Sequence, residues 1–363
     1  MNLKVGIVGL PNVGKSTLYT AITRNQAEIA NYPFCTIEPN ESLVELPDPR
    51  LHVLEDLAKS ERRIHATITF VDIAGLVKGA SEGQGLGNKF LNNIRDCDMI
   101  LHCVRCFDSQ DIIHVEGRVS PKDDAEIINL ELILSDLESI QSIIPKIEKV
   151  ARSNKEKEQT VLTLKKMLAH LENSLPLRSL ILSEEEKKSV KEYNFLTSKP
   201  VLYVGNVSED DILDENNPYV KALESIAKLE NAACLTISAK LEEELSQLSG
   251  DEAKDFLSMC GLKESGLSRI IRKSFELLGL ITYFTVGEKE ARAWTIRKGT
   301  LAPQAAGEIH SDLERQFIRA EVISYDDFVK CGSRSHAKEK GVARTEGKNY
   351  VVHDGDVILF FHG

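Results

Sequence analysis

The stretch that decides the fold is Gly9-Leu-Pro-Asn-Val-Gly-Lys-Ser16, which fits the pattern Gly-x-x-x-x-Gly-Lys-Ser/Thr. An apolar run from Lys4 to Gly9 predicts a strand before it, and Ser16 to Arg24 opens a predicted helix. In this setting the glycines let backbone N–H groups curl around a β-phosphate, the lysine reaches the β- and γ-phosphate oxygens, and the serine ligates magnesium. The stretch therefore predicts a site for a purine nucleoside triphosphate with Mg²⁺. The residues expected to contact the nucleotide here are Asn12, Val13, Gly14, Lys15, Ser16 and Thr17.

A second box, Asp72-Ile-Ala-Gly75, follows a predicted strand from Ala66 to Asp72. In switch-type NTPases an aspartate at this place orients magnesium, and the glycine N–H can reach the γ-phosphate. Thr36 lies in the loop between the two boxes, where a switch threonine adds a magnesium ligand while the γ-phosphate is present. We thus predict Ser16, Thr36 and Asp72 as metal ligands, and Lys15 and Gly75 as catalytic contacts.

The box that discriminates between bases reads Asn206-Val-Ser-Glu209, where a guanine-specific enzyme would show Asn-Lys-x-Asp. Val207 replaces the lysine, and Glu209 is one methylene longer than the aspartate that accepts from guanine. Loss of this guanine clamp removes the penalty against adenine. Asn206 is still able to contact N6 and N7 of adenine, and Ser238 in Ile237-Ser-Ala-Lys240 fits the last base-flanking loop. ATP is therefore favoured over GTP.

Two helical arms follow from about Asp123. Both have apolar residues at alternating spacings of three and four: Leu130, Ile133, Leu137, Ile140, Ile144 and Ile147, then Val161, Leu164, Leu168, Leu171 and Leu175. The charged stretch from Arg152 to Gln159 separates them, which predicts an antiparallel coiled-coil hairpin over about residues 123–197. Pro145 should kink the first arm or end it early.

The first 120 residues alternate apolar runs with helical patterns, as in a parallel sheet with crossover helices. Strand patterns resume at Pro200 to Val204 and at Ala233 to Ile237, so the hairpin is an insertion in this α/β domain, residues 1–277. After Gly279 a strand from Ile281 to Val286, a helix near Gly307 to Arg315 and short strands predict a separate small α+β module, residues 278–363.

Composition is that of an ordinary globular protein, with 42% hydrophobic and 28% charged residues. No apolar run is long enough to span a membrane, and the run near Met1 is too short for a signal peptide, so we expect a cytoplasmic protein. The net charge of −11 argues against a protein that coats nucleic acid, and no DNA partner is expected. Residues 331–348 carry five basic side chains against two acidic ones, which leaves open a solvated loop or a phosphate-contacting patch.

Seven scattered cysteines fit a reducing compartment. Cys97, His102, Cys103 and Cys106 cluster, which could suggest zinc or redox chemistry. Because Met99 to Cys106 has the pattern of a buried strand, we interpret these thiols as small core residues and claim no metal site.

The phosphate loop, the glycine-rich switch from Gly75 to Gly87, the Asn206–Glu209 box and the C-terminal module together resemble the YchF family of Obg-like ATPases. The resemblance runs through essentially the whole chain. It implies a P-loop NTPase G domain with an inserted coiled-coil hairpin, then a TGS domain of β-grasp fold. It also implies a preference for ATP and the ribosome as partner, with RNA contacts through the TGS domain and the hairpin.

Hydrolysis needs an unusual water-positioning group, since Leu76 stands where small GTPases have glutamine. The resemblance implies that His114 in Asp111-Ile-Ile-His114 replaces it. Asn12 stands where potassium-activated relatives in the wider class place a cation ligand, so K⁺ is a possible second cofactor; a structural loop asparagine is the equal alternative.

Three hypotheses about function follow. The first is a slow ATPase switch that acts on translation through the ribosome. The second is a GTP-dependent ribosome-assembly factor of the Obg type, which Val207 and Glu209 disfavour. The third is a nucleotide-gated binding protein whose hydrolysis is incidental, a hypothesis that Leu76 supports.

Overall fold

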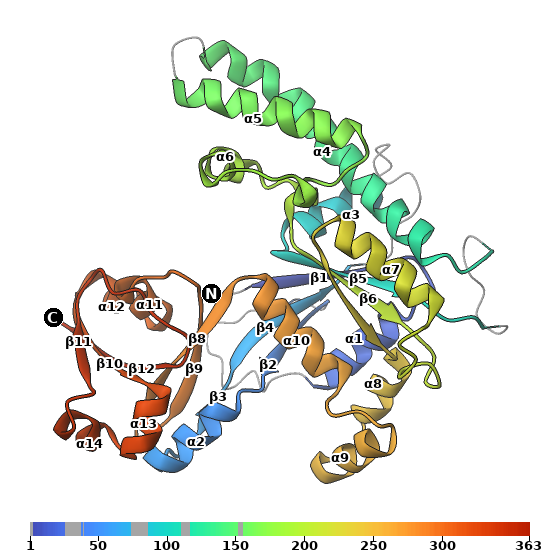
Figure 1. Ribbon diagram of the computed structural model, residues 1–363. Helices are drawn as coiled ribbons and strands as arrows, with labels where there is room; N and C mark the ends of the chain where they lie inside the picture. Colours follow the sequence, from blue (N-terminus) through green and yellow to red (C-terminus); the bar gives the residue numbers. More distant parts are fainter. Residues whose placement is uncertain (1–2, 26–37, 39, 74–85, 110–116, 152–154) are drawn as a thin grey trace.

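The computed structural model describes residues 3–25, 38, 40–73, 86–109, 117–151 and 155–363 (Figure 1). Its first sheet has six strands in the order β2-β4-β1-β5-β6-β7: β2 (Glu41–Leu46), β4 (Ala66–Asp72), β1 (Lys4–Val8), β5 (Met99–Arg105), β6 (Val201–Asn206) and β7 (Ala233–Ile237). All neighbours are parallel except β2 and β4, which are antiparallel. The predicted strands at 66–72, 200–204 and 233–237 are confirmed.

Helices cover both faces of this sheet, as its continuously apolar strands require. On one face α1 (Lys15–Arg24), α8 (Ala239–Leu245) and α10 (Gly266–Leu277) pack on Val5, Ile7 and Leu101. On the other face α3 (Leu86–Arg95), α7 (Pro218–Leu229) and the start of α4 (Pro121–Ala151) pack on Val8 and Ile100. The predicted α/β nucleotide-binding layout is confirmed.

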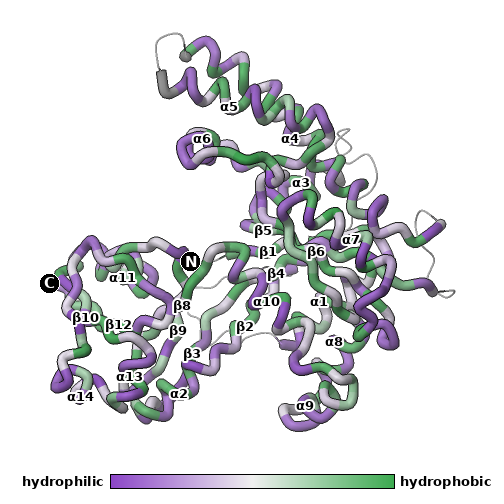
Figure 2. The backbone as a smooth tube through the Cα atoms, in the orientation of Figure 1, coloured by the Kyte–Doolittle hydropathy of each residue, from purple (hydrophilic) through white to green (hydrophobic). Residues whose placement is uncertain are grey.

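The helical insertion consists of α4 and α5 (Lys155–Glu172), followed by η3 (Leu177–Ser179), α6 (Glu184–Val190), η4 (Lys191–Tyr193) and η5 (Leu196–Ser198). β5 and β6 are neighbours in the sheet, so the segment is an insertion, as predicted. In Figure 2 both arms alternate between hydrophilic and hydrophobic residues, as amphipathic helices do. The arms join through their own core of Ile133, Ile140, Ile144, Leu164, Met167 and Leu171.

The hairpin departs from the sequence expectation at two points. Leu130 and Leu175 lie outside the seam and are 47% and 46% exposed. At the level of Leu130, α4 packs on α7 instead of α5, and Leu175 lies beyond the last residue of α5. Of the two effects expected of Pro145, a kink or an early end, the early end is wrong, because the helix continues to Ala151. Ile144, beside the proline, is buried against the other arm, and this interhelical packing offsets the lost backbone hydrogen bond.

The C-terminal module has a six-stranded sheet in the order β11-β10-β12-β8-β9-β3. Its own strands are β8 (Leu280–Val286), β9 (Ala291–Arg297), β10 (Phe317–Ser324), β11 (Arg344–Glu346) and β12 (Asp356–His362). The helices of the module are α11 (Ala302–Ile309), α12 (Ser311–Arg315), α13 (Tyr325–Cys331) and α14 (Arg334–Glu339).

This module is less separate than the sequence suggested. The sixth strand, β3 (Arg63–Ile64), comes from the first domain and pairs in parallel with β9. Leu51 and Leu54 of α2 (Pro49–Ala58) share one hydrophobic core with Phe284 and Val357 of the module. The first domain thus covers part of one apolar face of the sheet, and α11 covers the other face, which carries Tyr283 and Ile296.

Residues 331–348 form a helix and an edge strand, α14 and β11, where the sequence suggested a loop or a phosphate-contacting patch. The carboxylate of Glu321 forms ion pairs with Arg334 and Lys338, each at 2.9 Å. The guanidinium of Arg344 lies 3.7 Å from the carboxylate of Glu346. Glu321 therefore compensates one of the three excess positive charges of this segment, because Glu346 already belongs to the segment.

The thiols of Cys97, Cys103 and Cys106 are free and buried, which confirms their interpretation as core residues. Burial raises the pKa of Cys97 and of Cys103 to about 12, so both stay protonated and unreactive at neutral pH. None of the helices in the described ranges has the length and apolarity needed to cross a membrane.

Candidate functional site

The phosphate loop joins the end of β1 to the start of α1, with the positive end of the helix dipole directed at the loop. Gly14 precedes the helix at a φ of 94°, and a Cβ there would lie 2.2 Å from Nδ2 of Asn206. A Cβ on Gly9 would lie 2.6 Å from the carbonyl oxygen of Cys103. Close packing therefore requires both glycines, and the left-handed backbone conformation is a second reason for glycine at Gly14.

Lys15 and Asp72 meet at the carboxyl ends of neighbouring strands, where α/β folds of this kind bind ligands. The Lys15 Nζ lies 3.2 Å from Oδ1 of Asp72, with the side chains 11% and 28% exposed. Ser16 is exposed on the first turn of α1, and Thr17 is half-buried beside it. The predicted phosphate-binding cation and one predicted magnesium ligand are thus brought together.

Asn206 spans the phosphate loop and the last base-flanking loop. Its Nδ2 donates to the carbonyl oxygen of Val13 at 2.9 Å, and its Oδ1 accepts from the backbone N–H of Ala239 at 2.8 Å. The side chain is buried. The sequence predicted a contact with the adenine base, whereas the structure places both ends of the amide on backbone groups. Asn206 therefore holds the two loops together.

The other residues of the base boxes divide into core and surface. Val207 is 2% exposed and packs with Val13 in the core, so its side chain lies beneath the surface of the predicted base site. Glu209 is half-buried and accepts from Nζ of Lys240 at 2.6 Å, which links the loop after β6 to the first turn of α8. Ser238 is buried, and its hydroxyl has no hydrogen-bond partner within the described ranges.

Four of the predicted functional positions lie outside the described residues. These are Thr36, Gly75, Leu76 and His114. Asn12, at the tip of the phosphate loop, is described; it is exposed and has a φ of 63°.

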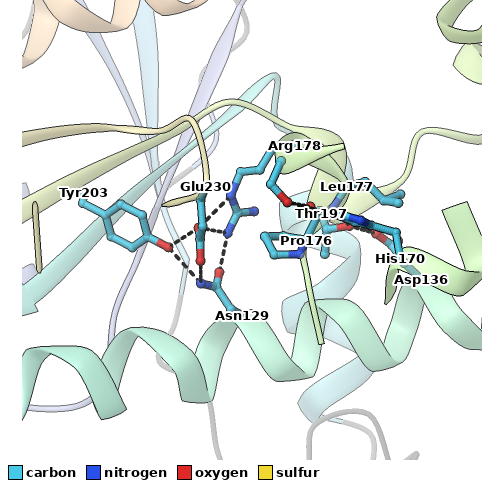
Figure 3. A network of polar contacts seen from close by, with 10 residues as sticks. Asn129, Asp136, His170, Pro176, Leu177, Arg178, Thr197, Tyr203 and Glu230 are labelled. Carbon is cyan, nitrogen blue, oxygen red and sulfur yellow. Dashed lines mark hydrogen bonds and ion pairs between the residues drawn. The ribbon is translucent and has the colours of Figure 1, made fainter. Parts of the chain in front are cut away.

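A buried polar network at the base of the hairpin was not predicted from the sequence (Figure 3). Glu230, at the end of α7, accepts from Nε and Nη2 of Arg178 at 3.0 and 2.7 Å and from the Tyr203 hydroxyl at 2.7 Å. Asn129 of α4 donates to Glu230 at 2.8 Å and accepts from Arg178 at 2.6 Å. The network therefore joins the hairpin, through Asn129, to β6, through Tyr203.

Further contacts fix the same region. Asp136 of α4 accepts from the backbone N–H groups of Leu196 and Thr197 at 2.9 and 2.8 Å, and from the Thr197 hydroxyl. Burial, with a smaller effect of nearby Arg178, lowers the pKa of His102 to about 3, so this histidine is neutral beside Tyr203. The sequence offers no signal for these contacts, since each joins residues far apart in the chain.

Two family models match the chain. Residues 4–166 match the model described as "50S ribosome-binding GTPase". Residues 280–362 match the C-terminal model of the YchF GTPases, described as "Protein of unknown function (DUF933)".

Curated relatives match over the full length. "Ribosome-binding ATPase YchF" of Haemophilus ducreyi is 51% identical over 361 residues, which cover 99% of each chain. The protein of that name in Bacillus subtilis is 51% identical over 362 residues, with the same coverage. The solved structure of the Schizosaccharomyces pombe YchF GTPase superposes with a TM-score of 0.90 at 39% identity, covering 99% of this chain and 98% of that one.

Proposed function

Since this chain belongs to the YchF family, we propose that it is a ribosome-binding ATPase, a slow nucleotide switch that modulates translation. The observation that carries the choice of ATP is the pairing of Glu209 with Lys240 at 2.6 Å. A guanine clamp directs its carboxylate at the base, whereas the carboxylate of Glu209 is turned to Lys240 at the start of α8. The names of the curated bacterial relatives agree with ATP, and they do not support the Obg-type alternative.

Magnesium fits the oxygen donors of this site. The Asp72 carboxylate is partly exposed at the end of β4, and the hydroxyl of Ser16 is exposed on the first turn of α1. Hard oxygen ligands of this kind suit Mg²⁺, and we propose both residues as its ligands, together with Thr36. When bound, the ion neutralises charge on the β- and γ-phosphate oxygens. Lys15 would then contact the same phosphates through Nζ.

We assign the ribosome contact to the hairpin and to the C-terminal module, which project from different sides of the first sheet (Figure 1). This assignment rests on the family resemblance, with RNA as the expected surface for both parts. A ribosome-binding protein would act in the cytoplasm. No DNA or membrane partner is proposed.

Nucleotide competition on the purified chain, in magnesium and potassium, tests the proposed function. We expect ATP to displace a fluorescent ATP analogue at concentrations about tenfold or more below those needed for GTP. The yeast relative of known structure is named a GTPase, whereas the bacterial relatives are named ATPases, so the two names correspond to opposite outcomes of this assay. A preference for GTP would restore the Obg-type hypothesis.

Turnover with and without purified ribosomes separates a switch from a binding protein with incidental hydrolysis. We expect ribosomes to change the steady-state ATPase rate, because the partner of a switch acts on its cycle. A rate that stays the same at saturating ribosome concentration would favour the binding protein.

We predict that His114→Ala leaves the affinity for ATP nearly unchanged and lowers the hydrolysis rate about tenfold or more, a loss of roughly 1.4 kcal/mol of transition-state stabilisation. The reason is that Leu76 cannot orient the attacking water. Single-turnover hydrolysis measures the effect, and His353→Ala, on the exposed surface of the C-terminal module, is the control. A rate equal to that of the control would rule out this role.

Asn12 motivates a prediction about potassium. If its side chain contributes to a K⁺ site beside the phosphates, the ATPase rate is higher in KCl than in NaCl at equal ionic strength, and Asn12→Ala removes the difference. Its exposed position at the tip of the phosphate loop fits this role, whereas its φ of 63° is equally expected of a structural loop asparagine. Equal rates in the two salts would leave Asn12 as a structural loop residue.

A further inference from the structure

Helix α9 (Gly250–Met259) is poorly covered by the rest of the protein. Figure 1 shows it outside the helices that cover the first sheet, beyond α8. None of its ten residues is fully buried. Its apolar residues Ala253, Phe256 and Leu257 share one face of the helix, with Cys260 one turn on, and all four are only half-buried.

The loop from Ser208 to Asn217 extends this surface. A Cβ on Gly261, just after α9, would lie 3.0 Å from Cδ1 of Leu213, so the loop and the end of the helix touch. Leu213 is 59% exposed and Met259 is 86% exposed. Helix α9 and this loop, together called the α9 face below, therefore present large apolar side chains to solvent.

The α9 face is also strongly acidic. Five of the ten residues in the loop are acidic and none is basic, and α9 adds three acidic residues and one lysine. That lysine, Lys254, is already paired with Asp251 at 3.1 Å. The only acidic group of the loop with an ion pair among the described residues is Glu209, which is held by Lys240. Two further lysines lie next to this surface: Lys221 donates to Oδ1 of Asn216 at 2.7 Å, and Lys263 follows α9. The carboxylates still outnumber the lysines and leave a negative field around the apolar side chains.

From these observations we propose that the α9 face docks a basic, amphipathic polypeptide segment of a partner protein. Lysine or arginine side chains of the segment would meet the carboxylates, and its apolar anchors would cover Leu213 and Met259. The same field repels RNA phosphates, anionic lipids and the α9 face of a second copy. Because Glu209 lies at the edge of this face, the docked segment would sit beside the base-flanking loops. This inference goes beyond the proposed function and does not depend on ATP hydrolysis.

The test uses the full chain and a synthetic leucine–lysine peptide that forms an amphipathic helix, followed by fluorescence anisotropy. Two double variants test the apolar and the charged contacts separately. Leu213→Ser with Met259→Ser removes the apolar side chains that the peptide would cover. Asp214→Lys with Asp255→Lys reverses two negative charges. Each is expected to weaken binding about tenfold or more. An unchanged affinity for ATP shows that both variants are folded.

Matched controls make the same changes elsewhere. Leu162→Ser with Ile181→Ser replaces side chains that are 57% and 85% exposed on the insertion, and Glu172→Lys with Glu185→Lys reverses two exposed charges there. We expect these variants to bind the peptide within about twofold of the unchanged chain.

Several outcomes would overturn the proposal. The first is an equal loss of peptide affinity in the test and the control variants. The second is that the unchanged chain does not bind the leucine–lysine peptide. The third is that it binds a leucine–glutamate peptide equally tightly. Self-association in sedimentation that Leu213→Ser with Met259→Ser abolishes would show that a second copy occupies the face instead.

Discussion

Arg178→Ala is expected to lower the free energy of unfolding by about 3 to 5 kcal/mol, because it leaves the carboxylate of Glu230 buried without its cation. The two side chains are only 5% and 11% exposed, and they meet at 2.7 Å. Tyr203 and Asn129 still donate to Glu230 in the variant, but neither carries a charge. The Nη1 group of Arg178 makes no hydrogen bond among the described residues, so its removal offsets part of the loss and favours the lower end of the range.

Urea unfolding of the intact chain measures this effect, and hydrogen exchange shows where it falls. Protection should be lost first in α4 and α7, the helices that the network joins. Lys165→Ala is a matched control, since it breaks an exposed ion pair with Glu148 on the same hairpin. Arg178→Ala combined with Glu230→Gln should recover part of the loss, because the buried group is then neutral. A loss for Arg178→Ala no larger than that of the control would contradict this account.

The sequence predicts those parts of the molecule that are determined by residues close together in the chain. The strand from Ala66 to Asp72 has the predicted bounds, and the phosphate loop joins a strand to a helix as its glycines require. The 3–4 spacing predicts the hairpin, and the strand patterns that resume after it predict its place between two paired strands. Each of these features depends on periodicity or on residues a few positions apart.

Features that depend on distant pairing could not be predicted in this way. The strand β3 has only two residues, too few for a periodic pattern, and only the structure shows that it completes the C-terminal sheet. Pro145 disfavours a helix locally, but packing between the arms keeps α4 continuous. Arg178 and Glu230 are 52 residues apart, and nothing around either one indicates burial.

Asn206 is the site residue whose role changed most between sequence and structure. The box in which it lies indicates contact with the base, whereas its amide bridges the backbone of Val13 and Ala239. These two roles predict different effects of one substitution on nucleotide affinity. If Asn206 contacts adenine, it favours the binding of ATP over GTP. If it only holds the two loops together, it favours the binding of both nucleotides equally.

We therefore expect Asn206→Ala to lower the affinities for ATP and for GTP by the same factor, about tenfold or more. The ratio of the two affinities should stay unchanged. The substitution removes partners from two backbone groups in the site, at a cost of about 1 to 3 kcal/mol for each group that stays buried and unpaired. Titration of a fluorescent analogue with each competitor measures both affinities. Gly14 packs directly against the same amide, since a Cβ there would lie 2.2 Å from Nδ2 of Asn206.

Asn217→Ala is the matched control, because Asn217 is also a buried asparagine that accepts from backbone N–H groups, those of Tyr219 and Val220 at the start of α7. That variant should lose about 1 kcal/mol of stability, as expected for a helix cap, with little change in nucleotide affinity. If Asn206→Ala instead lowered the affinity for ATP much more than the affinity for GTP, the base contact predicted from the sequence would be correct. The hydrogen bonds to Val13 and Ala239 would then be of secondary importance. The ratio of affinities thus decides between a residue that selects the base and one that shapes the site for the phosphates.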